Sequence, residues 1–352
     1  MFEPDASHLV QAAFNRQARR LPLYEHLIDT AFMEKVLHRS FAGLLNGDQK
    51  DRLEFFRIYT HFFLSMGYDT VSFECCLTEL VQQGQALQGL TGGMITNRDD
   101  FARFPFDGMR HRFMEAFETQ FLALGEVMPP GLKIVGGVGN GVFEILQDLC
   151  SLEGLCLILR QDPVLFADLC RSVGAVMENV WSDVLGRFEN LFAVCRFGDD
   201  LGYKMATLLD PKDIQKYIFP EYRRIVRLIH KKGKPFLFHS CGNIFELMEG
   251  LIIDVGIDAK HSNEDVIAPF FEWVNRYGER IGNFGGVDLS FLQTEDEQAV
   301  RKYSLQIILQ SMGKGGFAFG SGNSIPSGTP VENFLAMTRT AREWRGDKSR
   351  LS

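Results

Sequence analysis

A histidine and a cysteine that stand two residues apart are the pair in this sequence with the clearest chemical potential. His239 and Cys241 follow the apolar run 235–238 and precede Gly242. An imidazole nitrogen and a thiolate sulfur are both good zinc ligands, so the pair can supply two ligands of a metal site. The same spacing is also compatible with a buried cysteine beside a hydrogen-bonded histidine at the end of a strand.

Polar side chains and glycines also follow three other apolar segments. The polar residues are Asp199, Asp200 and Tyr203 after residues 191–197, Glu264 after residues 257–261, and Asn323 and Ser324 after residues 317–320. In a barrel of parallel strands, residues at the carboxyl ends of the strands and in the loops that follow face the active-site mouth. We therefore predict that these residues surround His239 and Cys241, although a single one of them could also cap a helix or close a turn.

Seven short apolar segments alternate with longer amphipathic stretches, which predicts strands alternating with helices. The predicted strands are residues 70–74, 133–137, 191–197, 235–239, 257–261, 281–285 and 317–320. The clearest predicted helices span residues 211–232 and 295–312, and the first has Asp210 as its N-cap and Gly233 at its end. Repeated strand–helix units form parallel sheets, and 352 residues favour closure into an eight-stranded barrel.

The predicted fold is therefore α/β, a single (β/α)8 TIM-type barrel with an N-terminal helical extension. Residues 1–62 form the extension, because apolar residues recur there at helical spacing, and residues 63–345 form the barrel. No low-complexity linker separates the two, so we expect one domain. An open doubly wound sheet is the alternative, but residues 136–141 have the wrong glycine spacing for a dinucleotide-binding turn.

Composition argues against several classes of partner. A formal net charge of −8 disfavours nucleic-acid binding, which needs clustered lysine and arginine. No apolar run approaches the roughly 20 residues of a membrane span, and the first residues lack the features of a signal peptide. Seven cysteines without a regular spacing predict reduced thiols in a cytoplasmic protein. The oligomeric state stays open, with a homodimer as one option.

Residues 222–337 resemble the C-terminal half of the uroporphyrinogen decarboxylase superfamily. The resemblance extends to residues 20–25, 141–144, 162–163 and 199–203, so it covers most of the chain. This superfamily also contains zinc-dependent methyltransferases that exchange methyl groups with corrinoid proteins. The chain is more similar to these corrinoid-dependent methyltransferases, of the O-demethylase type, than to true uroporphyrinogen decarboxylases.

Resemblance to the methyltransferase branch implies a zinc site. Its zinc ligands are a His-x-Cys after one strand and a cysteine after a much later strand, sometimes with a carboxylate. His239 and Cys241 match the first pair, whereas Asn323 stands where the later cysteine is expected. The resemblance therefore makes Glu264 the candidate for the third ligand. Zinc there would stabilise a leaving oxygen, and without a metal His239 or Glu264 would act as general acid.

Resemblance to the decarboxylase branch is weaker in the residues that hold a porphyrinogen. That branch uses an Arg-Gln-Ala-Gly-Arg segment to hold substrate carboxylates and an aspartate to meet the pyrrole nitrogens. Residues 16–20 imitate the first segment, whereas residues 70–74 have no aspartate at the expected position. A porphyrinogen with many carboxylates also needs a cationic cleft, and this chain is acidic.

The function predicted from the sequence is therefore methyl transfer between a small methylated donor, such as a methoxyaromatic compound, and a corrinoid-binding partner protein. Asp199, Asp200, Tyr203, Asn323 and Ser324 would contact the donor. Thirty-one phenylalanines would suit an aromatic-lined pocket, although a phenylalanine-rich core is the simpler explanation. A decarboxylase of the same superfamily and a non-catalytic binding subunit remain the alternatives.

Overall fold

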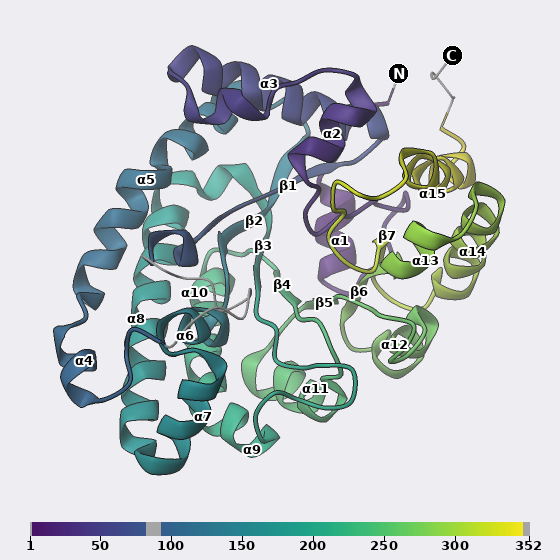
Figure 1. Cartoon of the computed structure of the whole chain (residues 1–352). Helices are drawn as coiled ribbons and strands as arrows, with labels where there is room; N and C mark the ends of the chain where they lie inside the picture. Colours follow the sequence, from purple (N-terminus) through teal and green to yellow (C-terminus); the bar gives the residue numbers. More distant parts are fainter. Residues whose placement is uncertain (1, 82–92, 348–352) are drawn as a thin grey trace.

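Seven parallel strands form a curled sheet at the centre of the molecule. The computed structural model describes residues 2–81 and 93–347, and Figure 1 shows the strands surrounded by helices. The strands, hydrogen-bonded to one another in sequence order, are β1 Thr70–Cys76, β2 Lys133–Gly139, β3 Phe192–Gly198, β4 Phe236–His239, β5 Ala259–His261, β6 Gly282–Val287 and β7 Phe317–Ser321. Each of them lies on one of the seven predicted segments, so those predictions are confirmed.

An extended stretch near the N-terminus, residues 23–28, occupies the eighth strand position, between β7 and β1. We call it the N-terminal stretch. Leu23 pairs in parallel with Phe319 of β7, and the N–H of Tyr24 donates to the carbonyl of Phe319 at 2.9 Å. On the other side, the Ser72 hydroxyl of β1 donates to the carbonyl of Glu25. The predicted α/β barrel is confirmed, while its eighth position is filled by this N-terminal stretch rather than by a further strand–helix unit.

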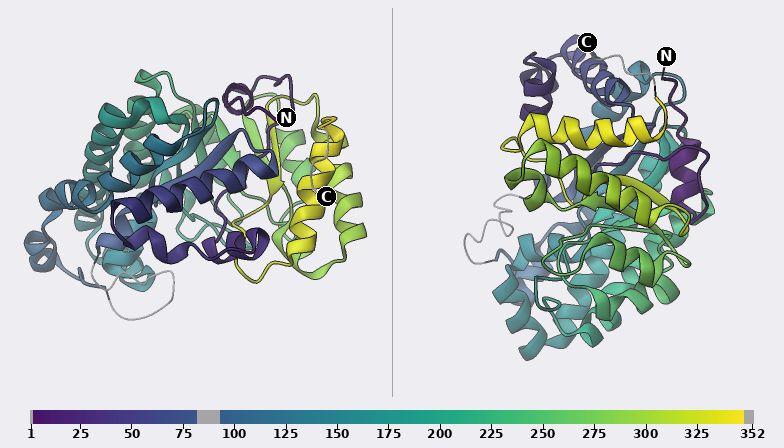
Figure 2. Two further views of the ribbon diagram at one scale, coloured as in Figure 1. Left: turned by 90° about the horizontal axis from the view of Figure 1, so that it is seen from above. Right: turned by 90° about the vertical axis from the view of Figure 1, so that its right-hand side faces the viewer.

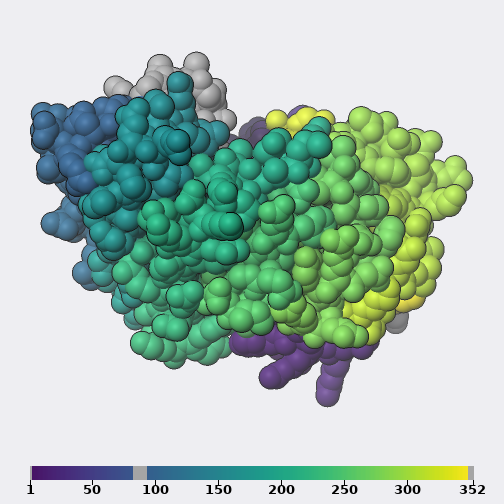
Figure 3. Space-filling model, turned by 90° about the horizontal axis from the view of Figure 1, so that it is seen from below, coloured from purple at the N-terminus to yellow at the C-terminus, as the bar shows by residue number. Residues whose placement is uncertain are grey.

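Helices surround the sheet. They are α1 Ser7–Ala13, α2 Thr30–Leu37, α3 Gln49–Met66, α4 Arg98–Arg103, α5 Phe106–Val127, α6 Val142–Cys150, α7 Leu152–Gln161, α8 Pro163–Phe188, α9 Pro211–Asp213, α10 Phe219–Lys231, α11 Met248–Gly250, α12 Phe270–Tyr277, α13 Leu289–Thr294, α14 Glu297–Ser311 and α15 Val331–Trp344. Figure 2 shows α14 and α15, in light green and yellow, side by side. Because helices follow their strands in turn, the surface in Figure 3 is coloured nearly in sequence order from blue to yellow. Within the described ranges, no helix has both the length and the apolar character that crossing a membrane requires.

Both helices that were predicted in detail are confirmed with small changes. The Asp210 side chain accepts the N–H of Lys212 at 2.8 Å and so caps the first helix, and Gly233 follows that helix with a φ of 66°. Within it, a π-helical turn at Ile214–Ile218 joins α9 to α10. The second predicted helix is α14, which Asp296 caps and which begins after the separate short helix α13.

The predicted N-terminal extension contains α1, α2 and most of α3. Helix α3 continues past residue 62 to Met66. The stretch between α1 and α2 contributes to the wall of the barrel through its pairing with β7. The division of the chain at residue 62 stays a prediction.

The interior of the barrel has an apolar half and a polar half. At the amino-terminal end, small and aliphatic side chains of α1 pack against inward-facing strand residues. We call this cluster the apolar plug, and its members include Leu9, Ala12, Ala13, Val135, Val194, Leu237, Ala259 and Ala318. Toward the carboxyl ends of the strands the interior carries charged and imidazole groups. We call this second set the polar layer, and it consists of His26, Glu74, Arg196, His239 and His261.

Candidate functional site at the carboxyl end of the barrel

Three donor atoms converge where β3 and β4 end. The Nε2 of His239 lies 3.5 Å from the Sγ of Cys241 and 4.0 Å from the Oδ1 of Asp200. The same Asp200 oxygen accepts the backbone N–H of Cys241 at 2.8 Å, which holds the carboxylate beside the loop. The three atoms all lie within 4.8 Å of one another. The structure thus brings together three of the residues that the sequence singled out.

A chain of hydrogen bonds determines which nitrogen of His239 faces this group. The Nε2 of His261 lies 3.1 Å from the carbonyl oxygen of Ser321, which can only accept, so Nε2 carries the proton. In neutral His261 the Nδ1 is then an acceptor, and the Nδ1 of His239, 2.7 Å away, donates to it. The Nε2 of His239 therefore keeps a lone pair directed toward Cys241 and Asp200.

Burial keeps the three imidazoles of the polar layer neutral. Loss of solvation lowers the pKa of His261 to about 3 and lowers the pKa values of His239 and His26 well below their usual range. The positive charge of Arg196 lowers all three pKa values further. His26 stacks on His239, with ring centroids 3.6 Å apart and planes 6° from parallel. Neutral imidazole is the form that binds a metal ion.

Arg196 connects two other members of the polar layer, Glu74 and His26. Its side chain is fully buried, and its Nη2 donates to the Oε2 of Glu74 at 2.6 Å. Its Nη1 donates to the hydroxyl of Tyr24 at 2.9 Å and to the carbonyl of His26 at 2.6 Å. A buried guanidinium requires such partners, since an uncompensated charge in the interior is strongly destabilising. The network fixes the backbone of His26 and so positions its ring against His239.

The sulfur of Cys241 has Asn323 as a direct neighbour. The side-chain amide of Asn323 donates to the Sγ of Cys241 at 3.3 Å. Burial raises the pKa of the Cys241 thiol above its usual range, and the carboxylate of Asp200 raises that pKa further. A cation beside the sulfur would favour the thiolate instead. The residue that replaces the expected cysteine is therefore in contact with the predicted metal-binding pair.

The donor set fits a zinc ion. Ligands at about 2.0–2.3 Å from zinc are roughly 3.3–3.8 Å from one another in tetrahedral geometry. The Nε2–Sγ separation of 3.5 Å lies in that range. The Nε2–Oδ1 separation of 4.0 Å requires a small rotation of Asp200, whose side chain is 32% exposed. Three protein ligands with the fourth position open are also the usual arrangement of a catalytic zinc site.

Glu264 lies next to this group but not within it. Its Oε1 accepts the backbone N–H of Gly242 at 3.1 Å. The residue lines a separate hollow of about 270 Å³, together with Lys204 and Asn323. Within the described part of the chain, Glu264 is not among the groups whose donor atoms could share one ion with His239. Its predicted roles as metal ligand and as general acid stay predictions.

Asp199 is engaged by the protein itself. Its two carboxylate oxygens accept the backbone N–H groups of Phe143 and Glu144, each at 2.8 Å, at the start of α6. The hydroxyl of Tyr222 also donates to it. The residue is fully buried, and burial raises its pKa to about 7. Asp199 thus holds the amino-terminal end of α6 at the barrel, and its predicted contact with a substrate stays a prediction.

The remaining predicted substrate contacts lie on loops at the same end of the barrel. Tyr203 is 50% exposed in the loop after β3, and its carbonyl accepts the N–H of Asn243 at 2.8 Å. Ser324 follows Asn323 in the loop after β7 and lines a cavity of about 580 Å³. Both loops follow the carboxyl ends of strands, as Cys241 does. Direct contact with a substrate stays a prediction for Tyr203, Asn323 and Ser324.

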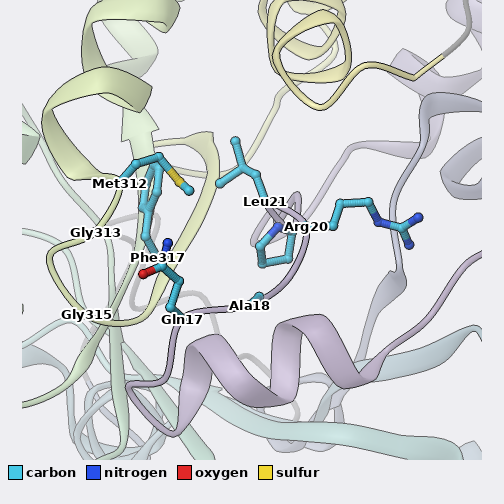
Figure 4. Close-up of a pocket in the computed structure, with 9 residues that line it drawn as sticks. Gln17, Ala18, Arg20, Leu21, Met312, Gly313, Gly315 and Phe317 are labelled. Carbon is cyan, nitrogen blue, oxygen red and sulfur yellow. The ribbon is translucent and has the colours of Figure 1, made fainter.

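A much smaller hollow lies at the opposite, amino-terminal end of the barrel. Figure 4 shows Gln17, Leu21, Met312 and Phe317 around it, with the side chain of Arg20 directed away from Met312 and Phe317. Its volume is about 10 Å³, which is enough for about one water molecule. This hollow is too small for a substrate.

The arginine-containing segment 16–20 lies at this same end. Arg20 forms an ion pair with buried Asp69, directly before β1. The segment also precedes Leu23, which pairs in parallel with Phe319, so it lies toward the amino-terminal end of the barrel wall. The arginines that imitate the carboxylate-holding segment of the decarboxylases are therefore separated from His239 by the depth of the barrel.

Sequence reasoning missed four members of the polar layer. His261 had a detectable signal, because it ends a predicted strand and the register of β4 with β5 pairs it with His239. Arg196 had one as well, since a charged residue inside an apolar strand requires a buried partner. Glu74 follows from Arg196 as that partner. His26 had no signal, because its place depends on how the N-terminal stretch enters the barrel.

Comparison with known proteins identifies the family. A family model described as Uroporphyrinogen decarboxylase (URO-D) matches residues 137–344. The fold is similar to that of a methyltransferase from Methanosarcina mazei, with a TM-score of 0.71 and 15% identity over 97% of this chain and 99% of that one. It is also similar to a putative vitamin-B12 independent methionine synthase from Listeria monocytogenes, with a TM-score of 0.52 and 13% identity over 94% of this chain and 98% of that one. No curated protein matches the chain.

At these identities the likeness to solved structures establishes the fold alone. The family match covers more than half of the chain and includes β3 to β7, and with them the loop that carries His239 and Cys241. The chain belongs to the uroporphyrinogen decarboxylase (URO-D) family.

Proposed function

We propose that this protein is a methyltransferase that moves a methyl group between a small methylated donor and a corrinoid carried by a separate protein. The observation that carries the proposal is the convergence of donor atoms from His239, Cys241 and Asp200 at the carboxyl ends of β3 and β4. Membership of the URO-D family supports it, and the fold likeness to a methyltransferase from Methanosarcina mazei is consistent with it.

A zinc ion held by His239, Cys241 and Asp200 would supply Lewis acidity to the heteroatom that loses the methyl group. That heteroatom gains electron density as its bond to the methyl carbon breaks, so stabilising it lowers the barrier, on the order of a few kcal/mol. We assign Asp200 as the third side chain because its oxygen belongs to the convergent group. Glu264 is the alternative third ligand, because its Oε1 accepts the N–H of Gly242, the residue that follows Cys241.

The tautomer of His239 favours binding a cation over donating a proton. His261 accepts the Nδ1 proton of His239, so the nitrogen that faces Cys241 carries a lone pair. An imidazole in this state is a ready metal ligand and is not a proton donor at Nε2. If the reaction proceeds without a metal, the general acid is therefore Glu264 rather than His239.

Decarboxylation of a porphyrinogen is less well supported. Its many carboxylates need several cationic partners at the barrel mouth. The segment 16–20 lies at the other end of the barrel, and Arg196 in the polar layer is already paired with Glu74. The imidazoles of the polar layer are held neutral by burial. These placements favour a small donor with little negative charge.

Metal analysis of two single variants tests the metal-centred part of the proposal. We expect about one zinc per chain in the wild-type protein and a loss of most of it in Cys241→Ala, because a thiolate is the strongest of the three ligands. Cys156→Ala is the matched control, since Cys156 is an exposed cysteine on α7. Equal zinc content in the two variants would contradict the assignment of Cys241.

Methyl transfer itself is tested by mixing the protein with a reduced corrinoid protein and a panel of methylated donors. Methylation of the corrinoid, followed by its absorption spectrum, is the expected result with at least one donor and should be lost in Cys241→Ala. If wild-type protein methylates the corrinoid with none of them and binds no zinc, the non-catalytic alternative is favoured.

A further inference from the structure

A cavity beside the polar layer has a lining that points to the charge of its ligand. It has a volume of about 580 Å³, which is the size of a typical small-molecule site. Its walls come from the N-terminal stretch, α3, β1, α5 and the loop after β7. Ser324 in this lining is the neighbour of Asn323, whose amide lies 3.3 Å from the Sγ of Cys241. The cavity therefore lies at the same end of the barrel as the proposed reaction centre.

Aromatic rings form much of the wall. Phe55, Tyr59, Phe73 and Phe117 all line the cavity and are themselves buried. The rings of Phe55 and Tyr59 are stacked, with centroids 5.7 Å apart, and the hydroxyl of Tyr59 donates to the carbonyl of Ser72. Such rings suit a planar or apolar ligand body, and their faces attract a positive charge.

Every side chain in the lining that is ordinarily charged at neutral pH is a carboxylate. Asp29 and Glu79 are exposed at the rim, and Glu74 lies deeper with a side chain that is 7% exposed. Among the described residues, no lysine or arginine lines the cavity. Arg196 binds one carboxylate oxygen of Glu74, Oε2, and no hydrogen bond to the other, Oε1, is found in the described part of the chain. Because Arg196 balances Glu74, the net negative charge of the cavity comes from the two rim carboxylates.

We propose that this cavity binds a methyl donor that carries a positively charged nitrogen, and that it rejects donors that carry a carboxylate. This inference rests on the proposed function in one respect, that the ligand is a methyl donor. The binding of a cation follows from the lining alone. The aromatic walls hold the body of the ligand. Its ammonium group lies against the ring faces within reach of Asp29 and Glu79. A carboxylate in the same position would meet only like charges.

Three ligands that differ in charge test this inference. They share a para-methoxyphenyl body and are para-methoxyphenethylammonium, neutral para-methoxybenzyl alcohol and the anion para-methoxybenzoate. Isothermal titration calorimetry with wild-type protein measures binding without any corrinoid partner. We expect the ammonium compound to bind roughly tenfold more tightly than the alcohol and the benzoate to show no saturable binding. The preference for the ammonium compound should also decrease as salt is added.

A variant with two rim substitutions identifies the residues responsible. Asp29→Asn combined with Glu79→Gln should weaken binding of the ammonium compound by roughly tenfold and leave that of the alcohol unchanged. In the wild-type protein the side chain of Asp29 accepts the N–H of Ala31. The side-chain oxygen of asparagine can accept the same N–H, so this substitution keeps the cap of α2. Glu279→Gln is the matched control, because Glu279 is exposed after α12 and does not line the cavity.

The outcomes separate this inference from the proposed function. Equal binding of the ammonium compound and the alcohol, tighter binding of the benzoate, or no binding of any of the three would each overturn the inference. Tighter binding of the ammonium compound than of the alcohol in the wild-type protein, with this preference lost in the variant with the two rim substitutions, would support it. The inference would then hold even if no methyl group reached the corrinoid, in which case the proposed function alone would fail.

Discussion

The two halves of the barrel interior come from the same strands yet hold opposite chemistry. On β3, β4 and β5 an inward-facing apolar residue of the plug is followed two residues later by a member of the polar layer. The pairs are Val194 and Arg196, Leu237 and His239, and Ala259 and His261. Side chains two apart on a strand share a face, so each strand supplies both halves. The change from apolar to polar therefore occurs at one depth across three strands.

The apolar plug stabilises the barrel, whereas the polar layer holds residues that can perform chemistry. The plug gains stability from burial of apolar surface, which needs no specific partner. The polar layer must satisfy each buried group with a defined partner, because unpaired charges and donors in the interior are costly. Four predictions test how independent the two halves are, from the largest expected effect to the smallest.

Removing the charge at the centre of the polar layer should have the largest effect. Arg196→Met leaves the Glu74 carboxylate buried without its partner, so we expect a loss of about 3–5 kcal/mol in the free energy of unfolding, measured with urea. The double variant Arg196→Met with Glu74→Gln should recover part of that loss. If the single variant costs less than about 1 kcal/mol, the network is not the structural centre of the layer.

A substitution in the apolar plug should reduce stability without affecting the site. Leu237→Ala creates a cavity in the plug, where Leu237 is fully buried, and should cost about 2–5 kcal/mol. The zinc affinity of the folded variant should stay at the wild-type value, as measured by competition with a chelator. A fall in zinc affinity would mean that the two halves are mechanically coupled.

The stability of the barrel should depend on pH through Glu25, which is buried between β1 and β7 near the polar layer. Burial raises the pKa of Glu25 from 4.5 to about 7. Its contribution to stability is therefore fully present below about pH 4.5 and is lost as the pH rises through about 7. Relative to wild type, Glu25→Gln should be more stable at about pH 8 than at about pH 4, by about 3 kcal/mol. Urea unfolding at both pH values measures this difference, and a constant difference would rule out a raised pKa for Glu25.

Loss of the residue that orients His239 should give the smallest energetic effect. His261→Phe removes the acceptor for the Nδ1 proton of His239, so zinc affinity should fall roughly 10- to 100-fold. His261→Gln offers a new acceptor and should recover part of the affinity. His61→Phe, at an exposed position on α3, is the control for adding a phenylalanine. An unchanged affinity in His261→Phe would show that His239 does not need this orientation.

The strands of the barrel could be predicted because each has a short apolar run of its own. All seven predicted segments overlap strands, and the β4 segment ends at His239 in both the prediction and the structure. The eighth position could not be predicted in the same way. The stretch that includes Leu23 has few residues paired in the sheet, and its place depends on contacts with β7 and β1.

The candidate site was predictable only in part. The sequence placed Asp200, His239 and Cys241 at the carboxyl ends of two strands that prove to be neighbours, which is why they meet. It also singled out Asp199, whose carboxylate proves to be engaged with the start of α6. No local pattern distinguishes a carboxylate that caps a distant helix from one that faces a ligand.

By itself the sequence determined the alternation of strands and helices, the order of the strands in a parallel barrel and the His-x-Cys pair at the end of β4. These features depend on residues that are close together in the chain. Only the tertiary structure decided the tautomer of His239, the pairing of Arg196 with Glu74 and the acidic aromatic cavity near Ser324. Each of these joins segments that are distant in sequence, and closure of the barrel is what brings them within reach of one another.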